Sequence, residues 1–334
     1  MIPLLILLIS SLIVLVVATL SSVGTFFVVF YIMNKSFGRR CDGYAHAYYF
    51  TAEDYPELSR DGFSFLSNKK QRLYGYLYHR EGIEPKGLII FLHGIGAGHV
   101  AYTRLINRLA DSGNIIMAFD YTGCGMSEGR SMKSMIQGVV DLEYALKYID
   151  QNDEIKKLPR YAIGHSWGGF LALNVLNIKD SNVLKVVSLA GFDTQTSAIT
   201  TLKEKKQYLA VPFAFLNNLF HYGKYALYSS KKALKRTSAE VLYIQGEQDR
   251  SIKPKYSGEI FQKIALNKRN IKVEIIEGKM HNCYLSKRAQ DYQTAMIKKY
   301  GIFRRPITDG YKIDYDLLTE LDENLMKQII DFIG

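Results

Sequence analysis

Apolar residues occur along this chain in two patterns, one long N-terminal run and a series of short runs separated by polar turns. Residues 2–33 contain no charged residue, and about 20 apolar residues suffice for a helix to cross a bilayer. From residue 87 onward, short continuous apolar runs alternate with segments of helical periodicity. Such runs are typical of strands buried on both faces of a parallel sheet. The pattern predicts an apolar N-terminal helix followed by an α/β domain.

The domain is predicted to contain eight strands. The first two, 63–67 and 73–78, flank a polar turn and read as a hairpin. The other strands are expected at 87–92, 115–119, 161–163, 183–189, 241–246 and 271–276, with helices at 102–110, 136–149 and 324–333. Alternation of strand and helix through residue 191 implies right-handed crossovers, and therefore a mostly parallel sheet.

The N-terminal run allows two interpretations, a membrane anchor and a secretory signal peptide. A signal peptide has a basic start, a shorter apolar stretch and a small-residue cleavage site. No Lys or Arg precedes this run, and apolar residues resume at 23–27 after the small residues of 18–22. We therefore favour an uncleaved single-pass anchor over residues 1–33, followed by a polar and aromatic connector over 34–60. Lys35, Arg39 and Arg40 follow the run, so the positive-inside bias predicts a cytoplasmic domain.

Composition narrows the possible partners. The chain is 48% hydrophobic and 22% charged, which is ordinary for a globular protein. Its net charge of +11 could indicate a nucleic-acid partner, but the sequence contains no recognisable nucleic-acid-binding motif. An anchored protein has an anionic lipid surface beside it, which explains a basic balance equally well. We therefore expect membrane lipid and no nucleic acid as a partner, and the sequence predicts no oligomeric state.

The cysteines argue against a metal site or a disulfide framework. Cys41, Cys124 and Cys283 are odd in number and show no C-x-x-C spacing. That usage fits a reducing compartment. Clusters of His, Cys and acidic residues at ligand spacing are absent, and so is a phosphate-binding glycine loop. The sequence therefore predicts neither a metal nor a cofactor.

Residues 164–168, GHSWG, lie between a predicted strand and a predicted helix. This is the G-x-S-x-G pattern in the strand–turn–helix context that a nucleophile elbow requires. Glycines flank the serine because a strained turn that projects one side chain brings the neighbouring backbone too close for a Cβ. The motif predicts that Ser166 stands above the sheet as a nucleophile.

Five motifs together carry a resemblance to a known family. They are FLHGIGAG at 91–98, FDYTGCGMSEG at 119–129, GHSWGG at 164–169, YIQGEQDRSI at 243–252 and GKMHN at 278–282. In order and spacing they resemble the α/β-hydrolase superfamily, and within it the bacterial serine hydrolases similar to monoacylglycerol lipases and serine aminopeptidases. The resemblance implies an α/β-hydrolase fold, in which residues 61–191 and 239–334 form a mostly parallel eight-stranded sheet with helices on both faces.

The resemblance also implies a catalytic triad. In this fold the chain order is Ser, then Asp or Glu, then His. Of the seven histidines, only His281 follows the strand that should carry the acid, so His281 is the expected base. Asp249 and Glu247 share one turn, and the family pattern G-x-x-D selects Asp249 as the acid.

Two backbone N–H groups are expected to form the oxyanion hole. By position in the family, one comes from the loop after the strand at 87–92 and the other from the residue after the nucleophile, which gives Ile95 and Trp167. The resemblance gives two nearby residues structural roles instead. His93 is expected to be a buried histidine that braces its loop, and Asp120 to tie down the loop after the next strand.

Residues 192–238 interrupt the alternation of strand and helix. Their aromatic residues, interspersed with Lys and Arg, are Phe192, Tyr208, Phe213, Phe215, Phe220, Tyr222, Tyr225 and Tyr228. The segment resembles the helical cap that α/β hydrolases insert after the sixth strand, and such a cap would cover an acyl-binding cleft. The alternative is an ordinary helical insertion whose aromatic residues pack inward.

These expectations combine into one functional hypothesis, a membrane-anchored serine hydrolase that works through an acyl-enzyme on Ser166. A small acyl ester or a lipid ester suits a basic, aromatic-rich segment beside a membrane. Amide or small-peptide cleavage, as in the aminopeptidase-like relatives, is the alternative enzyme activity. A fold that has lost catalysis and serves as a membrane-tethered binding module is the alternative outside enzymes, although the complete triad and glycine loop argue against it.

Overall fold

The domain is built on one eight-stranded sheet. The computed structural model describes residues 2–43, 47–202, 211–301 and 310–334. Its strands are β1 (Ser59–Leu66), β2 (Arg72–His79), β3 (Leu88–Leu92), β4 (Ile115–Phe119), β5 (Arg160–His165), β6 (Val183–Leu189), β7 (Glu240–Gly246) and β8 (Ile271–Ile276). They lie in the order β1-β2-β4-β3-β5-β6-β7-β8, antiparallel at β1–β2 and β2–β4 and parallel elsewhere. The predicted mostly parallel, eight-stranded sheet is confirmed.

Helices cover both faces of this sheet. The described α-helices of the domain are α2 (Thr103–Ala110), α3 (Met135–Gln151), α4 (Trp167–Asn174), α5 (Gln195–Leu202), α6 (Val211–Tyr222), α7 (Ser230–Arg236), α8 (Gly258–Ala265), α9 (Lys287–Tyr300), α10 (Tyr315–Leu318) and α11 (Glu323–Ile333). One apolar cluster joins the sheet to α3, α4, α7 and α8, and a second joins it to α2 and α11.

The continuous apolar run of β3 follows from this two-sided burial. Leu88, Ile90 and Leu92 enter the first cluster, while Ile89 and Phe91 enter the second. Because successive strand residues point to opposite faces, a strand covered on both sides needs an apolar residue at every position. The same argument holds for β4, which is also apolar along its whole length.

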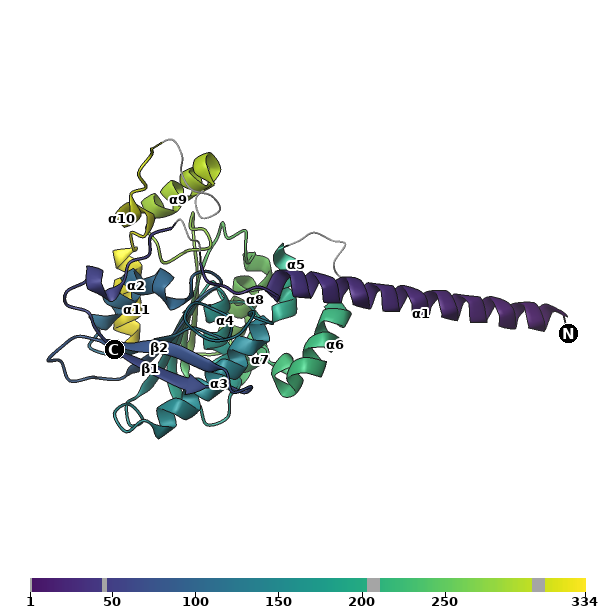
Figure 1. Cartoon of the computed structure of the whole chain (residues 1–334), viewed down its shortest axis with the longest axis horizontal. Helices are drawn as coiled ribbons and strands as arrows, with labels where there is room; N and C mark the ends of the chain where they lie inside the picture. The colour runs from purple at the N-terminus through teal and green to yellow at the C-terminus, as the bar shows by residue number, and fades with distance from the viewer. Residues whose placement is uncertain (1, 44–46, 203–210, 302–309) are drawn as a thin grey trace.

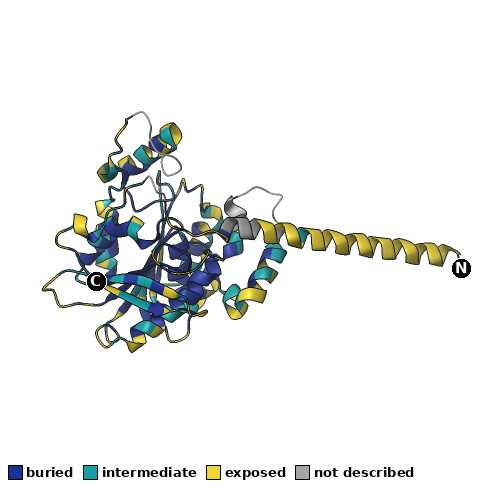
Figure 2. Ribbon diagram, viewed as in Figure 1, coloured by how far each residue is buried: buried dark blue, intermediate teal, exposed yellow. Residues whose placement is uncertain are grey.

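The N-terminal helix α1 (Ile2–Phe37) extends away from the domain (Figure 1). Its side chains are exposed along nearly the whole projecting length (Figure 2). By length and composition Ile2–Val28 could cross a membrane, although a signal sequence has the same character. The helix continues past the predicted end of the span at residue 33 and ends on Phe37, whose side chain is buried in the domain. Near the domain, α1 lies against α6.

The chain that leaves α1 is hydrogen-bonded to the domain. The Arg40 guanidinium donates to three carbonyl oxygens of the loop after β4, those of Gly125, Ser127 and Gly129, at 2.6–3.0 Å. Cys41 pairs with Cys124 of that loop in an isolated parallel bridge. Part of the predicted connector is therefore fixed to the domain, while residues 44–46 of it lie outside the described residues.

Replacing Arg40 by Ala in the full-length protein should destabilise the domain by about 2 kcal/mol, because three carbonyl groups lose a charged donor that is only partly exposed to solvent. Urea unfolding in detergent measures the change. The matched control is Arg39→Ala, whose exposed side chain should contribute less than about 0.5 kcal/mol. Equal effects of the two substitutions would contradict the proposed role of Arg40.

Candidate active site

Ser166 lies in the tight turn between β5 and α4, and its backbone is strained. Its φ is 57° and its ψ is −114°, a conformation that side-chain-bearing residues rarely adopt. A Cβ on Gly164 would collide with the backbone of Gly168, and a Cβ on Gly168 would collide with the carbonyl of Leu92. The two glycines are therefore required by the close approach of β3, β5 and α4, which is the steric reason inferred from the sequence.

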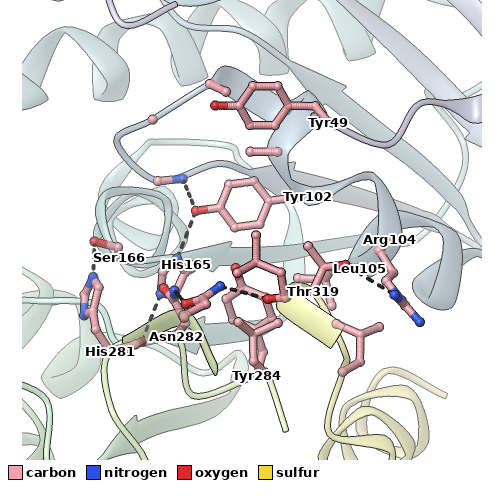
Figure 3. A pocket seen from close by; sticks show the side chains of 18 of the residues that line it. Tyr49, Tyr102, Arg104, Leu105, His165, Ser166, His281, Asn282, Tyr284 and Thr319 are labelled. Carbon is pink, nitrogen blue, oxygen red and sulfur yellow. Dashed lines mark hydrogen bonds between the residues drawn. The ribbon is translucent and has the colours of Figure 1, made fainter. Parts of the chain in front are cut away.

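The structure brings Ser166, His281 and Asp249 into one line of hydrogen bonds. Ser166 Oγ lies 2.9 Å from His281 Nε2 (Figure 3), and His281 Nδ1 lies 2.8 Å from Asp249 Oδ2. With the Nδ1 proton donated to the carboxylate, Nε2 is left to accept the hydroxyl proton of Ser166. Such an arrangement can deprotonate a serine hydroxyl and hold the resulting imidazolium.

Asp249 is held rigidly in the turn after β7. Its Oδ1 accepts hydrogen bonds from the backbone N–H groups of Ser251 and Ile252 at 2.8 and 2.9 Å, and its side chain is fully buried. Glu247, the other acid of this turn, is exposed, and its carboxylate instead accepts a hydrogen bond from the Gly278 N–H at 3.3 Å. The geometry therefore favours Asp249 over Glu247 as the partner of His281.

The two expected oxyanion-hole donors are both available. Gly94 N–H donates to the Tyr102 hydroxyl and Gly96 N–H to the Cys41 sulfur. The Ile95 N–H between them has no hydrogen-bond acceptor among the described residues. Trp167 is the first residue of α4, so its N–H has no intrahelical acceptor. The Trp167 indole is buried and donates to the Met135 carbonyl at 3.0 Å, which fixes the start of the helix.

The structure adds a pair of side chains, His165 and Tyr102, for which no role was predicted from the sequence. Gly94 N–H donates to the Tyr102 hydroxyl at 3.1 Å, that hydroxyl donates to His165 Nδ1 at 2.9 Å, and His165 Nε2 donates to the His281 carbonyl at 3.1 Å. Burial lowers the pKa of His165 to about 3, with a further contribution from His281. A neutral imidazole therefore links the loop of Ile95 to the loop of His281.

His93 and Asp120 have the structural roles expected of them. His93 is completely buried, donates to the Gly94 carbonyl at 2.7 Å and stacks on Tyr121, and its burial lowers its pKa to about 4. Asp120 accepts hydrogen bonds from the His99 side chain and from the Met126 N–H. Burial alone would raise the pKa of Asp120, but the neighbouring histidines and N–H donors outweigh it and lower the pKa to about 2.

A pocket of about 240 Å³ opens beside Ser166 and His281. Ser166 and His281 lie at one end and Arg104 at the other (Figure 3). Its walls come from residues 48–49, 94–97, 101–102, 104–105, 281–282, 284–285, 318–319 and 321, with His165 and Gln293. In the described ranges, His, Cys, Asp and Glu nowhere gather in a group of three or more that could hold a metal ion.

The described part of the insertion 192–238 is helical but does not line this pocket. Phe192 stacks on Phe170 of α4 at 4.8 Å between ring centroids, and four other aromatic residues of the insertion pack against the first apolar cluster. Phe215 and Phe220 are exposed on α6, and Tyr208 lies outside the described residues. The expectation that these aromatic side chains cover the cleft is therefore not met by the described ones, because the insertion packs on α3, α4 and α1.

Sequence comparisons support the same fold. The family described as serine aminopeptidase, S33, matches residues 83–211. "Putative esterase/lipase 2" of Mycoplasma genitalium is 23% identical over 79% of this chain and 99% of its own length. Human monoglyceride lipase is 32% identical over 27% of this chain, and proline iminopeptidase of Clostridioides difficile is 28% identical over 28% of it. These last two alignments cover less than a third of either relative.

Solved structures agree on the architecture. An esterase of Pyrococcus furiosus superimposes with a TM-score of 0.56 over 79% of this chain and 97% of its own, at 17% identity. Brefeldin A esterase, a bacterial homologue of human hormone-sensitive lipase, superimposes with a TM-score of 0.57 over 92% of this chain and 84% of its own, at 15% identity. At these identities the likeness establishes the fold alone. Sheet order, serine turn and sequence matches together show that the chain has the α/β-hydrolase fold.

Proposed function

We propose that this protein is a membrane-anchored serine hydrolase that cleaves carboxylic esters through an acyl-enzyme on Ser166. The observation that carries the proposal is the continuous hydrogen-bond line from Ser166 through His281 to Asp249 at the end of a pocket. A fold retained only as a binding module would have no need for an aligned serine, imidazole and buried carboxylate on a strained turn.

The proposed reaction follows from the positions of these groups. His281 Nε2 takes the proton of Ser166 as Oγ attacks the ester carbonyl carbon, and the Ile95 and Trp167 N–H groups bind the oxyanion that forms. His281 then gives its proton to the leaving alcohol, which departs and leaves the acyl-enzyme. Water, deprotonated by the same imidazole, releases the acid. Asp249 holds the imidazole in the required tautomer and stabilises its cationic form.

The charge of the pocket favours an ester over a free aminoacyl substrate. None of the described residues that line it is Asp or Glu, and its one Arg, Arg104, is already paired with Asp316 outside the lining. A substrate with a free α-ammonium group would therefore bury a charge without a carboxylate partner, which is unfavourable. Relatives named as esterase and monoglyceride lipase agree with an ester, while the S33 family name and proline iminopeptidase keep aminoacyl cleavage as the second candidate.

The anchor is the second part of the proposal. The apolar surface of α1 is left uncovered by the domain, and a bilayer would bury it. Arg39 and Arg40 follow the apolar stretch, so we propose that α1 is a single-pass anchor and that the domain faces the cytoplasm. Membrane lipid is then the nearest partner of the domain.

Replacing Ser166 by Ala should lower kcat for ester hydrolysis by about 10³-fold or more, because the nucleophile is removed while the fold is kept. Hydrolysis of 4-nitrophenyl butyrate and labelling by a fluorophosphonate both measure the loss. Ser59→Ala at the edge of the sheet is the matched control and should keep full activity. Activity of Ser166→Ala within tenfold of the wild type would contradict the assignment.

Replacing Asp249 by Asn should lower kcat by about 10⁴-fold, since an amide no longer holds the imidazole in the tautomer that accepts the serine proton. The isosteric change Glu247→Gln in the same turn should leave kcat within about twofold of the wild type. The two variants are compared in one assay, with thermal unfolding as a check on folding. If Glu247→Gln were the more damaging of the two, the acid would be assigned wrongly.

The full-length protein should remain in the membrane fraction through high-salt and alkaline washing, because a spanning helix is held by burial of apolar surface and not by charge. A chain that begins at Asn34 should be released by the same washes. A tag after Gly334 should resist protease added to intact cells. Digestion of that tag from outside would reverse the proposed orientation, and a secreted product that begins near residue 20 would contradict the anchor.

A further inference from the structure

The pocket beside Ser166 is closed by two segments that are far apart in the sequence. Tyr48 and Tyr49 come from the connector after α1, and Leu318, Thr319 and Leu321 come from the segment after α9. The two segments meet directly, because the Tyr48 ring packs edge-on against the ring of Tyr315 in α10, with centroids 5.5 Å apart. Tyr49 and Thr319 are seen on opposite sides of the pocket in Figure 3.

The C-terminal wall is continuous with the loop that carries His281. Asn282 donates to the side chain of Gln293 in α9, and Gln293 donates to the Leu318 carbonyl, both at 3.0 Å. Leu285 and Leu321 form an antiparallel bridge. The buried ammonium group of Lys279, in the same loop, pairs with Asp322 at 2.7 Å. Residues 318–322, three of which line the pocket, are therefore held in place beside the loop of His281.

The far end of the pocket is closed by Arg104, whose positive charge is paired with Asp316. Arg104 Nη1 donates to the Asp316 carbonyl at 2.8 Å, to its carboxylate at 3.1 Å and to the Thr319 hydroxyl at 3.2 Å. The Arg104 guanidinium also lies 6.0 Å from the centre of the Phe50 ring. This cation is therefore paired within the protein and closes the pocket against the C-terminal segment.

Between Ser166 and Arg104 the walls are mainly uncharged, with Ala101, Tyr102, Leu105, Leu318 and Leu321 among the residues. An uncharged hydrocarbon chain loses no hydrogen bonds in such a space and gains from leaving water. The volume of about 240 Å³ is below the roughly 300–1,000 Å³ usual for drug-sized ligands. The space therefore suits a short chain better than a long one.

We propose that this pocket binds the acyl chain of a short- to medium-chain ester, and that its walls set the chain-length preference in place of residues 192–238. These walls are formed by the two terminal segments (48–49, 318–319 and 321) together with residues 101–102 and 104–105. The inference rests on the proposed function, since it takes the ester carbonyl to lie over Ser166. The acyl part is assigned to this pocket because its wall begins at the loop of Ile95, whose N–H faces the carbonyl oxygen in the proposed reaction.

The test uses the full-length protein in detergent with 4-nitrophenyl esters from acetyl to decanoyl. In the wild type, kcat/KM should rise by up to about fourfold for each added methylene until the pocket is full, and then level off or fall. Ala101 lines the pocket and is exposed, so an indole placed there fills the space without displacing core residues. In Ala101→Trp the advantage of hexanoyl over acetyl in kcat/KM should fall at least tenfold.

The matched control is Ala226→Trp, in the short helix Gly223–Leu227 of the insertion, which should leave the chain-length profile unchanged. Thermal unfolding checks each variant, and Ala101→Leu replaces Ala101→Trp if the larger residue prevents folding. An unchanged profile in the folded Ala101 variant would overturn the proposal. So would a profile that collapses in Ala226→Trp, a wild type that prefers acetyl esters, or a preference that follows the alcohol chain in a series of acetates.

Failure of the proposed function gives a different result. A wild-type protein that hydrolyses no ester of the series and does not react with an alkyl fluorophosphonate would overturn both proposals. A protein that reacts with the fluorophosphonate through Ser166, but whose labelling rate is the same for ethyl and hexyl reagents in the wild type and in the Ala101 variant, would overturn only the acyl pocket.

Discussion

The close approach of three backbone segments around Ser166 is the constraint on which the rest of the site depends. β3, β5 and the start of α4 come so near to one another that Gly164 and Gly168 cannot carry a Cβ. That approach holds Ser166 in a strained conformation, and it leaves the Trp167 N–H unpaired at the first position of α4. A strained turn persists only where the surroundings determine it fully, and here the buried sheet on both sides does so.

Around this turn, three loops are held together mainly by neutral hydrogen bonds. His165 and Tyr102 connect the loop of Gly94 with the carbonyl of His281, so the expected oxyanion donor and the expected base share one support. Burial keeps His165 uncharged, which preserves the directions in which its two nitrogens donate and accept. A protonated imidazole there would offer a donor to the Tyr102 hydroxyl and compete with the Gly94 N–H for its oxygen.

The sequence predicted those features that depend on local chemistry. β3 could be predicted because burial on both faces demands an apolar residue at every position. The serine turn could be predicted because its glycines are sterically required. Asp249 could be chosen over Glu247 only through the family pattern. The pocket could not be predicted, since Tyr48 and Leu318 reach the same cavity only through tertiary packing. The prediction that the aromatic residues of 192–238 cover the cleft failed for the described residues for a related reason. Composition indicates that aromatic side chains will be buried, but it does not indicate which face of the domain they pack against.

The connector links the proposed anchor to the proposed chemistry. A few residues after α1 ends, the backbone of Cys41 forms a parallel β-bridge with that of Cys124, and the Cys41 sulfur accepts a hydrogen bond from the Gly96 N–H at 3.0 Å. Gly96 adjoins Ile95, whose N–H is expected to bind the oxyanion, and Tyr48 of the same connector forms part of the pocket wall. The segment that leaves the apolar helix therefore contributes to the site itself. A domain attached in this way is held in a fixed relation to its helix, so the orientation of the pocket toward a membrane would be set by the fold and not by a flexible tether.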